Sequence, residues 1–267
     1  MTRLRSAFAR PAPRLIPFVV AGDPDLSTTE EVILALADAG AAAIELGIPF
    51  SDPVADGPVI QAAAERARAA GTTVPRVLDL VARIRARTDV PLVLFSYFNP
   101  ILRHGPERFA CDAAQAGADG VLTVDLPAEE AHHLAPLLRH AGLDPIFLVA
   151  PTTGDARLQT IASEASGFIY AVARTGVTGA GGGSPAEAAQ TLVTRIRAVS
   201  DLPVAVGFGV SSPGDVQAVS AYADGVVVGS ALVKALSDVA PHGSRAATAA
   251  TFVRDLLGPF SSPTAPS

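Results

Sequence analysis

The chain is poor in the residues typical of disulfide-rich, aromatic-rich or membrane-spanning proteins. Its 267 residues include one cysteine, Cys111, no tryptophan and only 5% aromatic residues. A single cysteine excludes an internal disulfide and fits a reducing compartment, and no motif around Cys111 marks it as a nucleophile. No stretch reaches the roughly 18 apolar residues of a membrane span, and no long apolar run precedes a cleavage site near the N-terminus. These absences predict a cytoplasmic protein that does not enter a membrane.

An excess of positive charge is also missing. A net charge of −6 and a pI near 5.3 argue against nucleic acid or an anionic membrane as the main partner. A phosphorylated metabolite remains possible, because it needs only a local anion site. The sequence has no GxxxxGK[ST] nucleotide loop and no His/Cys cluster with metal-ligand spacing. His132 and His133 are adjacent in a helical pattern, which predicts that they point in different directions into solvent.

Strand-like and helix-like segments alternate about eight times along the chain. The expected strands are 15–20, 42–46, 91–96, 119–124, 145–150, 167–172, 203–207 and 224–228. The expected helices between them are 28–39, 58–70, 75–87, 106–116, 128–141, 155–165, 185–199 and 213–221. Such alternation is typical of a parallel sheet with covering helices.

The number of units decides between two parallel architectures. Eight units in 267 residues fit a (β/α)8 barrel, whereas an open doubly wound sheet would carry GxGxxG after its first strand. Ala21-Gly22-Asp23-Pro24 stands there instead. We therefore predict an α/β fold, a single-domain TIM barrel spanning 1–267. Its ordered part should run from about 15 to 257, and the Ser/Pro/Thr-rich tail at 258–267 should be disordered.

Residues 44–58 place acidic side chains where a barrel keeps its active site, at the carboxyl end of a strand. Glu45 lies within an apolar run, where burial would raise its pKa and suit it to acid/base chemistry near neutral pH. Asp56, on the following loop, which we expect to be solvated, should stay ionised and could accept a hydrogen bond from a substrate N–H. The structural alternative is that Glu45 pairs with an arginine and that Asp52 or Asp56 caps the next helix. Asp23 and Asp125, after strands 1 and 4, are weaker candidates because aspartate commonly ends strands.

Three glycine-rich segments follow the sixth, seventh and eighth strands. They are 174–184, 207–212 and the pair Gly229-Ser230. Loops after the last barrel strands commonly bind phosphate through backbone N–H groups at a helix start. Tight turns would explain each segment alone, but three at one end of adjacent strands favour a phosphate site. Segment 179–184 is long enough to act as a lid that closes over substrate.

These features together resemble the α subunit of tryptophan synthase over roughly residues 15–257. The stretch IELGIPFSDPVADGPVIQ at 44–61 matches the signature strand and loop of that family. Further matches, in chain order, are FVVAGDPD at 18–25, SYFNPIL at 96–102, VDLP at 124–127, ARTGVTG at 173–179, GFGVSS at 207–212 and VVVGSALVK at 226–234. Val20 departs from the pattern, which has threonine there, and the segment before Phe18 is shorter than is common.

The resemblance implies a TIM-barrel lyase that cleaves indole-3-glycerol phosphate to indole and glyceraldehyde 3-phosphate, with no metal or organic cofactor. Glu45 would be the general acid/base, and Asp56 would hold the indole N–H. The other residues that fall on the family's substrate site are Phe18, Tyr97, Leu122, Asp125, Tyr170, Thr178, Gly179, Phe208, Gly209, Gly229 and Ser230. Among them, Thr178 corresponds to the lid threonine that orders the catalytic aspartate.

The same resemblance implies an α2β2 complex that passes indole to a PLP-dependent β subunit. Asp52, Asn99 and Pro100 would lie in the contact, on loops 48–57 and 97–105. Three alternatives remain open from the sequence: a stand-alone lyase that releases indole, a catalytically idle partner subunit, and a different phosphosugar enzyme such as an isomerase.

Overall fold

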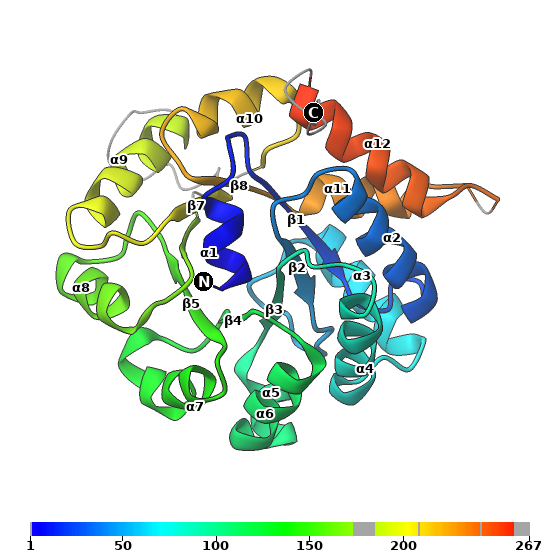
Figure 1. The fold of residues 1–267 in the computed structure, drawn as a ribbon, viewed down its shortest axis with the longest axis horizontal. Coiled ribbons are helices and arrows are strands. Elements are labelled where there is room, and N and C mark those ends of the chain that lie inside the picture. Colours follow the sequence, from blue (N-terminus) through cyan, green and yellow to red (C-terminus); the bar gives the residue numbers. More distant parts are fainter. Residues whose placement is uncertain (1, 173–184, 208, 241, 259–267) are drawn as a thin grey trace, which may run out of the picture.

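Eight parallel strands, hydrogen-bonded in sequence order, close into a barrel within the described part of the chain (Figure 1). The computed structural model describes residues 2–172, 185–207, 209–240 and 242–258. The strands are β1 (Leu15–Val20), β2 (Ile44–Gly47), β3 (Leu92–Ser96), β4 (Gly120–Thr123), β5 (Asp144–Val149), β6 (Ile169–Val172), β7 (Val204–Gly207) and β8 (Gly225–Val228). β1 pairs with both β2 and β8, so the sheet has no edge. The predicted (β/α)8 barrel is confirmed.

Helices surround the barrel and connect successive strands (Figure 1). They are α1 (Arg3–Phe8), α2 (Leu26–Asp38), α3 (Pro58–Ala69), α4 (Val74–Arg85), α5 (Phe98–His104), α6 (Pro106–Ala116), the 3₁₀ helix η1 (Ala128–His133), α7 (Ala135–His140), α8 (Asp155–Glu164), α9 (Pro185–Arg197), α10 (Pro213–Ser220), α11 (Ser230–Ser237) and α12 (Arg245–Leu257). None of the described helices is both long enough and apolar enough to span a membrane.

One predicted helix, 128–141, is wrong as a single element. It forms η1 and then α7, with Leu134 between them at φ −133° and ψ −44°. Pro136, in the first turn of α7, has no N–H to donate to the carbonyl of His132. The chain therefore winds as a short 3₁₀ turn and starts again as a new helix.

The strands are buried on both faces, as parallel barrel strands must be. All six residues of β1 are buried. Leu15 and Val19 pack outward into the layer between barrel and helices, whereas Ile16 and Phe18 belong to clusters on the other face of the strand. This alternation decides which side chains can reach the barrel interior.

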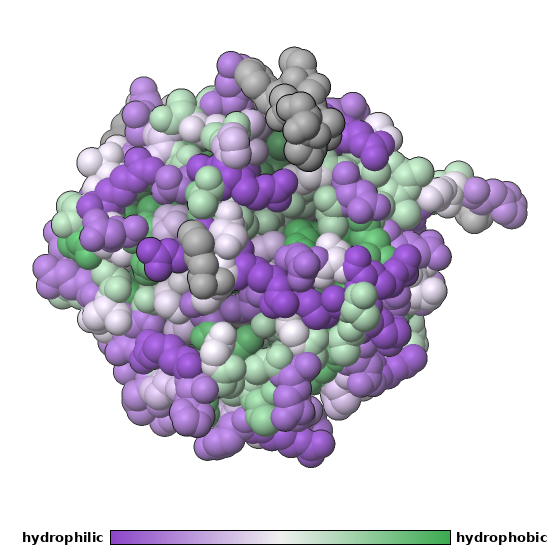
Figure 2. Space-filling view, viewed as in Figure 1, coloured by the Kyte–Doolittle hydropathy of each residue, from purple (hydrophilic) through white to green (hydrophobic). Residues whose placement is uncertain are grey.

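Helix α1 lies across the middle of the barrel and closes its amino-terminal end (Figure 1). Leu4 is fully buried and belongs to the interior cluster that also contains Ile16 and Leu122. The ring of Phe8 packs against that of Phe168, with centroids 5.3 Å apart. Hydrophilic residues gather over the middle of this face, over α1 (Figure 2). This end of the barrel is therefore sealed by side chains.

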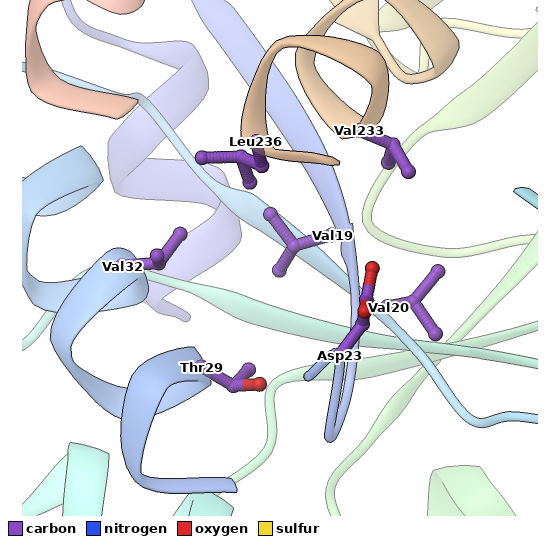
Figure 3. Close-up of a pocket in the computed structure, with 7 residues that line it drawn as sticks. All are labelled: Val19, Val20, Asp23, Thr29, Val32, Val233 and Leu236. Carbon is purple, nitrogen blue, oxygen red and sulfur yellow. The ribbon is translucent and has the colours of Figure 1, made fainter. Parts of the chain in front are cut away.

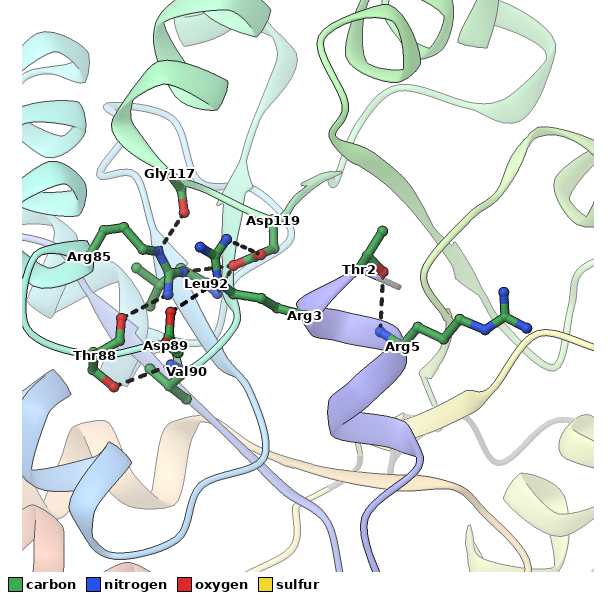
Figure 4. A network of polar contacts seen from close by, with 10 residues as sticks. All are labelled: Thr2, Arg3, Arg5, Arg85, Thr88, Asp89, Val90, Leu92, Gly117 and Asp119. Carbon is green, nitrogen blue, oxygen red and sulfur yellow. Dashed lines mark hydrogen bonds and ion pairs between the residues drawn. The ribbon is translucent and has the colours of Figure 1, made fainter.

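A network of ion pairs surrounds the closed end (Figure 4). Asp119, before β4, receives Arg85 Nη2 at 2.8 Å and Arg3 Nη1 at 3.3 Å. It also accepts the backbone N–H of Leu92 at 2.9 Å. The Asp119 side chain is only 6% exposed, so its charge is neutralised where water is scarce. The network joins α1, α4 and the starts of β3 and β4.

Candidate active site

Glu45 is a buried carboxyl group at the centre of β2. Its side chain is 1% exposed, and neither carboxyl oxygen has a hydrogen-bond partner among the described residues. Burial raises its pKa from 4.5 to about 8, because the charged form would lose its hydration. No described arginine pairs with it, so the structural alternative of an arginine partner finds no support there. Such a group is neutral at pH 7 and able to give up a proton.

An aromatic wall lies beside Glu45. Phe18 on β1 is the register partner of Glu45, and the ring of Phe95 on β3 meets the ring of Phe18 edge-on with centroids 5.1 Å apart. Gly47 makes room for this wall, because a Cβ there would lie 2.7 Å from Cζ of Phe18. The arrangement provides flat apolar surface next to the carboxyl group, which suits an aromatic ligand.

Tyr170 and Leu122 belong to the same interior cluster, from β6 and β4. Burial raises the pKa of Tyr170 well above its ordinary value, and the nearby charge of Glu45 adds to the shift. A Cβ on Gly207 would collide with the Tyr170 hydroxyl, so the lack of a side chain at Gly207 leaves room for the phenol. The structure therefore brings three of the predicted residues, Glu45, Tyr170 and Leu122, to the barrel interior.

Asp56, on the loop after β2, is held by Tyr97, which follows the neighbouring strand β3. The Tyr97 hydroxyl donates to Asp56 Oδ2 at 3.1 Å and accepts the backbone N–H of Ala55 at 3.0 Å. Asp56 is half-buried, and burial raises its pKa while the Tyr97 hydrogen bond opposes the shift. The expectation of a solvated carboxylate is thus corrected. Neither Asp52 nor Asp56 caps α3, whose N-cap is Gly57 without a side-chain hydrogen bond.

The two weaker aspartate candidates have structural partners. Asp125 accepts the backbone N–H of Phe98 at 2.6 Å and so fixes the start of α5. Asp23 forms a two-point ion pair with Arg66, at 2.8 and 2.7 Å. Asp125 therefore supports the loop that carries Tyr97, and Asp23 joins β1 to α3.

The two helix starts after β7 and β8 differ in their ability to bind an anion. Before α10, the N–H groups of Ser211 and Ser212 already donate to the Asp215 carboxylate, at 3.0 and 2.9 Å. Before α11, Gly229 is an N-cap without a side-chain hydrogen bond, and the exposed Ser230 follows. A helix start without a capping side chain is an anion site, whereas a carboxylate at the other start repels anions. The start of α11 is thus the better candidate for the predicted phosphate site, with Gly209, at φ +49°, on the neighbouring loop.

Two small cavities in the described part of the chain lie outside this site. One, lined by Val19, Asp23, Thr29 and Leu236 among others, sits between β1, α2 and α11 (Figure 3). Its volume of about 10 Å³ holds at most one water. A second, of the same volume, lies between β4, β5, η1 and α7. Neither can accept a substrate. The predicted residues Thr178, Gly179 and Phe208 lie outside the described residues, as does the lid 179–184.

Comparison with known proteins decides the family. The sequence profile described as tryptophan synthase alpha chain matches residues 4–256. The chain belongs to the tryptophan synthase alpha chain family. It is 50% identical to the tryptophan synthase alpha chain of Geobacter sulfurreducens over 264 residues, which cover 97% of this chain and all of the relative.

Solved structures of the family have the same fold. The α subunit from Legionella pneumophila matches with a TM-score of 0.87 and 34% identity, over 96% of this chain and 97% of that one. A structure of the Pyrococcus furiosus tryptophan synthase α2β2 complex matches with a TM-score of 0.82 and 39% identity, over 91% and 97%. Membership of the family confirms the predicted enzyme class, a lyase of tryptophan biosynthesis.

Sequence reasoning missed Phe95, which completes the aromatic wall. Its signal was the alternation along β3, where Val93 and Phe95 share the inward face. It also misplaced the two histidines of η1. The rings of His132 and His133 face each other with centroids 4.0 Å apart, instead of diverging. A 3₁₀ turn rotates successive residues differently from the expected α-helix.

Proposed function

We propose that this chain cleaves indole-3-glycerol phosphate to indole and glyceraldehyde 3-phosphate, with Glu45 as the proton-transferring group. The observation that carries the proposal is a fully buried carboxyl group without a hydrogen-bond partner among the described residues, with a pKa of about 8. Structural carboxyl groups in proteins are paired or hydrogen-bonded when buried, so an unpaired one is a candidate for catalysis.

One group can serve both proton transfers in sequence. Neutral Glu45 protonates C3 of the indole ring, which becomes an indolenine, and Glu45 becomes a carboxylate. That carboxylate then takes the proton of the glycerol hydroxyl next to the bond. The carbon–carbon bond breaks as the aldehyde forms, and its electron pair restores the indole. Glu45 ends neutral, so the net change is a proton moved from oxygen to carbon.

Asp56 stabilises the positive charge that this sequence creates. A protonated indole carries its charge on the ring nitrogen, and a carboxylate that accepts the N–H favours that state more than the neutral substrate. Tyr97 fixes the Asp56 carboxylate by its hydrogen bond of 3.1 Å. The indole ring would lie against Phe18 and Phe95, whose rings line the same wall.

The phosphate of the substrate would bind at the start of α11. Gly229 and Ser230 offer backbone N–H groups and a hydroxyl there, and α10 offers its own to Asp215 instead. Glu45 lies within β2 and the start of α11 follows β8, and these two strands flank β1 on its two sides. Ring and phosphate would therefore anchor at separate points of the barrel mouth, with Gly209 beside the phosphate. Gly179, expected in the phosphate cradle, Phe208, expected in the indole pocket, and Thr178, expected in the lid, lie outside the described residues.

The Glu45→Gln variant tests the chemistry. We expect its kcat to fall by about 10²- to 10⁴-fold, the usual contribution of a general acid or base. Glyceraldehyde 3-phosphate release would be measured, together with a thermal unfolding curve to show that the variant folds. Glu65→Gln, an exposed carboxyl group on α3, is the matched control and should leave kcat unchanged. An active Glu45→Gln enzyme would refute the assignment and favour another phosphosugar reaction.

We further propose that the chain acts in the cytoplasm as part of an α2β2 complex, the assembly that the related Pyrococcus furiosus tryptophan synthase forms. Two large apolar side chains support a partner at the mouth of the barrel. Val54, on the loop that carries Asp56, is 74% exposed, and Leu102 on α5 is 55% exposed. Both stand on the two segments, 48–57 and 97–105, that the family resemblance predicts to contact the partner. Asp52 and Asn99 are exposed on the same two segments, with Pro100 beside them.

The partner contact has its own test. Val54→Asp and Leu102→Asp should each weaken binding to a β subunit by at least ten-fold in a sedimentation or titration experiment. Val199→Asp is the control, because Val199 is an exposed apolar residue just past the end of α9. We also expect the β subunit to raise turnover, since it would order the loop of Asp56. Fast turnover without a partner would instead indicate a stand-alone lyase.

A further inference from the structure

Three metal-ligating side chains come together on η1, and none of them is among the candidate active-site residues described above. Glu130, His132 and His133 are all exposed, and one ligand atom of each lies within 4.8 Å of the others. Among the described residues they are the group of three that meets this spacing. The two histidine rings face each other, with centroids 4.0 Å apart.

The backbone of η1 directs these side chains outward. Ala128 and Ala131 are buried, at 6% and 1% exposed, and fix one face of the turn against the protein. Residues three apart nearly eclipse each other in a 3₁₀ helix, so Glu130 and His133 lie side by side. Glu130 Oε2 and His133 Nε2 are 3.3 Å apart.

That distance suits two ligands of one metal ion. Zinc binds imidazole nitrogen and carboxylate oxygen at about 2.0–2.2 Å, so two ligands at a tetrahedral angle lie about 3.4 Å apart. The ligand atom of His132 lies within 4.8 Å of the other two. Imidazole with carboxylate is a donor set for zinc, nickel and copper.

Neighbouring charges leave the three groups available. Glu129, the adjacent carboxylate, receives Arg157 of α8 at 2.7 Å. Arg157 is therefore paired with Glu129 and not with Glu130. Within the described residues, the ion-pair partner of Glu130 is His133 itself, and only if the ring is protonated.

We propose that Glu130, His132 and His133 form a surface site for a divalent transition-metal ion, with Zn²⁺ as its probe. Three protein ligands leave at least one position to water, so the site is labile compared with a closed four-ligand structural site. A bound ion would cross-link the turn that follows β4 and Asp125, and would slow its local opening. The alternative is a solvated Glu130–His133 ion pair that has no metal affinity.

The test is a Zn²⁺ titration of the untagged full chain after treatment with a chelator, because an affinity tag would bind the ion itself. Calorimetry should give one equivalent bound, and the absorption of Co²⁺ in its place should report nitrogen and oxygen ligands. His132→Ala and His133→Ala should each lower the affinity at least ten-fold, and Glu130→Gln should lower it less. His140→Ala, an exposed histidine on α7, is the control and should bind as the original chain does.

Hydrogen exchange supplies the second readout. Zn²⁺ should slow amide exchange across 126–134 and leave β1 unchanged, and the double variant His132→Ala/His133→Ala should show no such slowing. Equal binding by this double variant and the original chain would overturn the proposal, as would the absence of saturable binding. None of these variants touches Glu45 or Asp56, so failure here leaves the proposed lyase function intact.

Discussion

Buried carboxyl groups at the two ends of the barrel differ in whether they have hydrogen-bond and ion-pair partners. At the amino-terminal end, Asp119 is 6% exposed and receives two arginines and a backbone N–H. At the mouth, Glu45 is 1% exposed and receives no hydrogen bond from any described residue. Both groups lose hydration on folding, but only Asp119 is compensated by its neighbours.

The difference separates structural from functional polar groups within one fold. A compensated carboxylate stays charged and stabilises the closed end around α1. An uncompensated carboxyl group costs stability whenever it ionises, and it is kept at a site where a proton must move. The same contrast holds for aspartates at the mouth, where Asp23 has Arg66 and Asp56 has only Tyr97 and backbone contacts in the described chain.

The largest effect expected from this contrast is a pH dependence of folding stability. The pKa of Glu45 is about 8 in the folded chain against an ordinary value of 4.5, so the folded state keeps a proton that the unfolded state releases. The contribution of Glu45 to the free energy of unfolding is therefore fully present below about pH 4.5 and is lost as the pH rises toward 8. The loss should be on the order of a few kcal/mol, given about 1.4 kcal/mol per pKa unit.

Urea unfolding at a series of pH values between these limits would measure this loss. The difference in unfolding free energy between Glu45→Gln and the original chain should grow in favour of the variant as the pH rises, since glutamine does not titrate. If the unfolding free energies of the two proteins instead differ by the same amount at every pH, Glu45 has a partner in solution.

A substitution at the closed end should change the free energy of unfolding and leave kcat unchanged. Asp119→Asn keeps an acceptor for Leu92 but removes the ion-pair partner of Arg85, whose side chain is 12% exposed. We expect a loss of about 2–3 kcal/mol in unfolding free energy, somewhat below that for a fully buried pair. Asp89→Asn is the control, because Asp89 is 94% exposed and its contact with Arg3 is screened by water.

The kcat of Asp119→Asn, measured on folded protein, tests whether the closed end also affects catalysis. The kcat of Asp119→Asn should match that of the original chain at a temperature where both are folded. A fall in kcat without a loss of stability would mean that the two ends are coupled, and the division between them would be wrong.

Much of this contrast could be predicted from the sequence, because it depends on local patterns. The apolar run around Glu45 was enough to predict a buried carboxyl group, and β1 has the predicted limits of 15–20. Alternation along the strands then places Phe18, Glu45 and Tyr170 inside the barrel.

Contacts between distant segments could not be predicted in this way. Asp56 and Tyr97 are 41 residues apart in the chain, so a loop that looked solvated is half-buried by its partner. The carboxylate of Asp215 takes the N–H groups of a glycine-rich segment that looked equally suited to phosphate. Each outcome depends on contacts in the tertiary structure, which patterns in a single sequence do not reveal.

The smallest expected effect concerns the hydrogen bond that distinguishes Asp56 from a fully uncompensated group. Tyr97→Phe removes the hydroxyl but keeps the ring that packs against Phe50, with centroids 5.2 Å apart. A hydrogen bond to a charged group contributes about 1.5 kcal/mol or more, so kcat should fall roughly ten-fold or somewhat further. The acid limb of the kcat/KM profile should also move to higher pH, because this bond lowers the pKa of Asp56. Tyr222→Phe is the control, since the buried Tyr222 hydroxyl has no hydrogen-bond partner among the described residues. An unchanged pH profile in Tyr97→Phe would show that Asp56 is positioned by its loop and not by Tyr97.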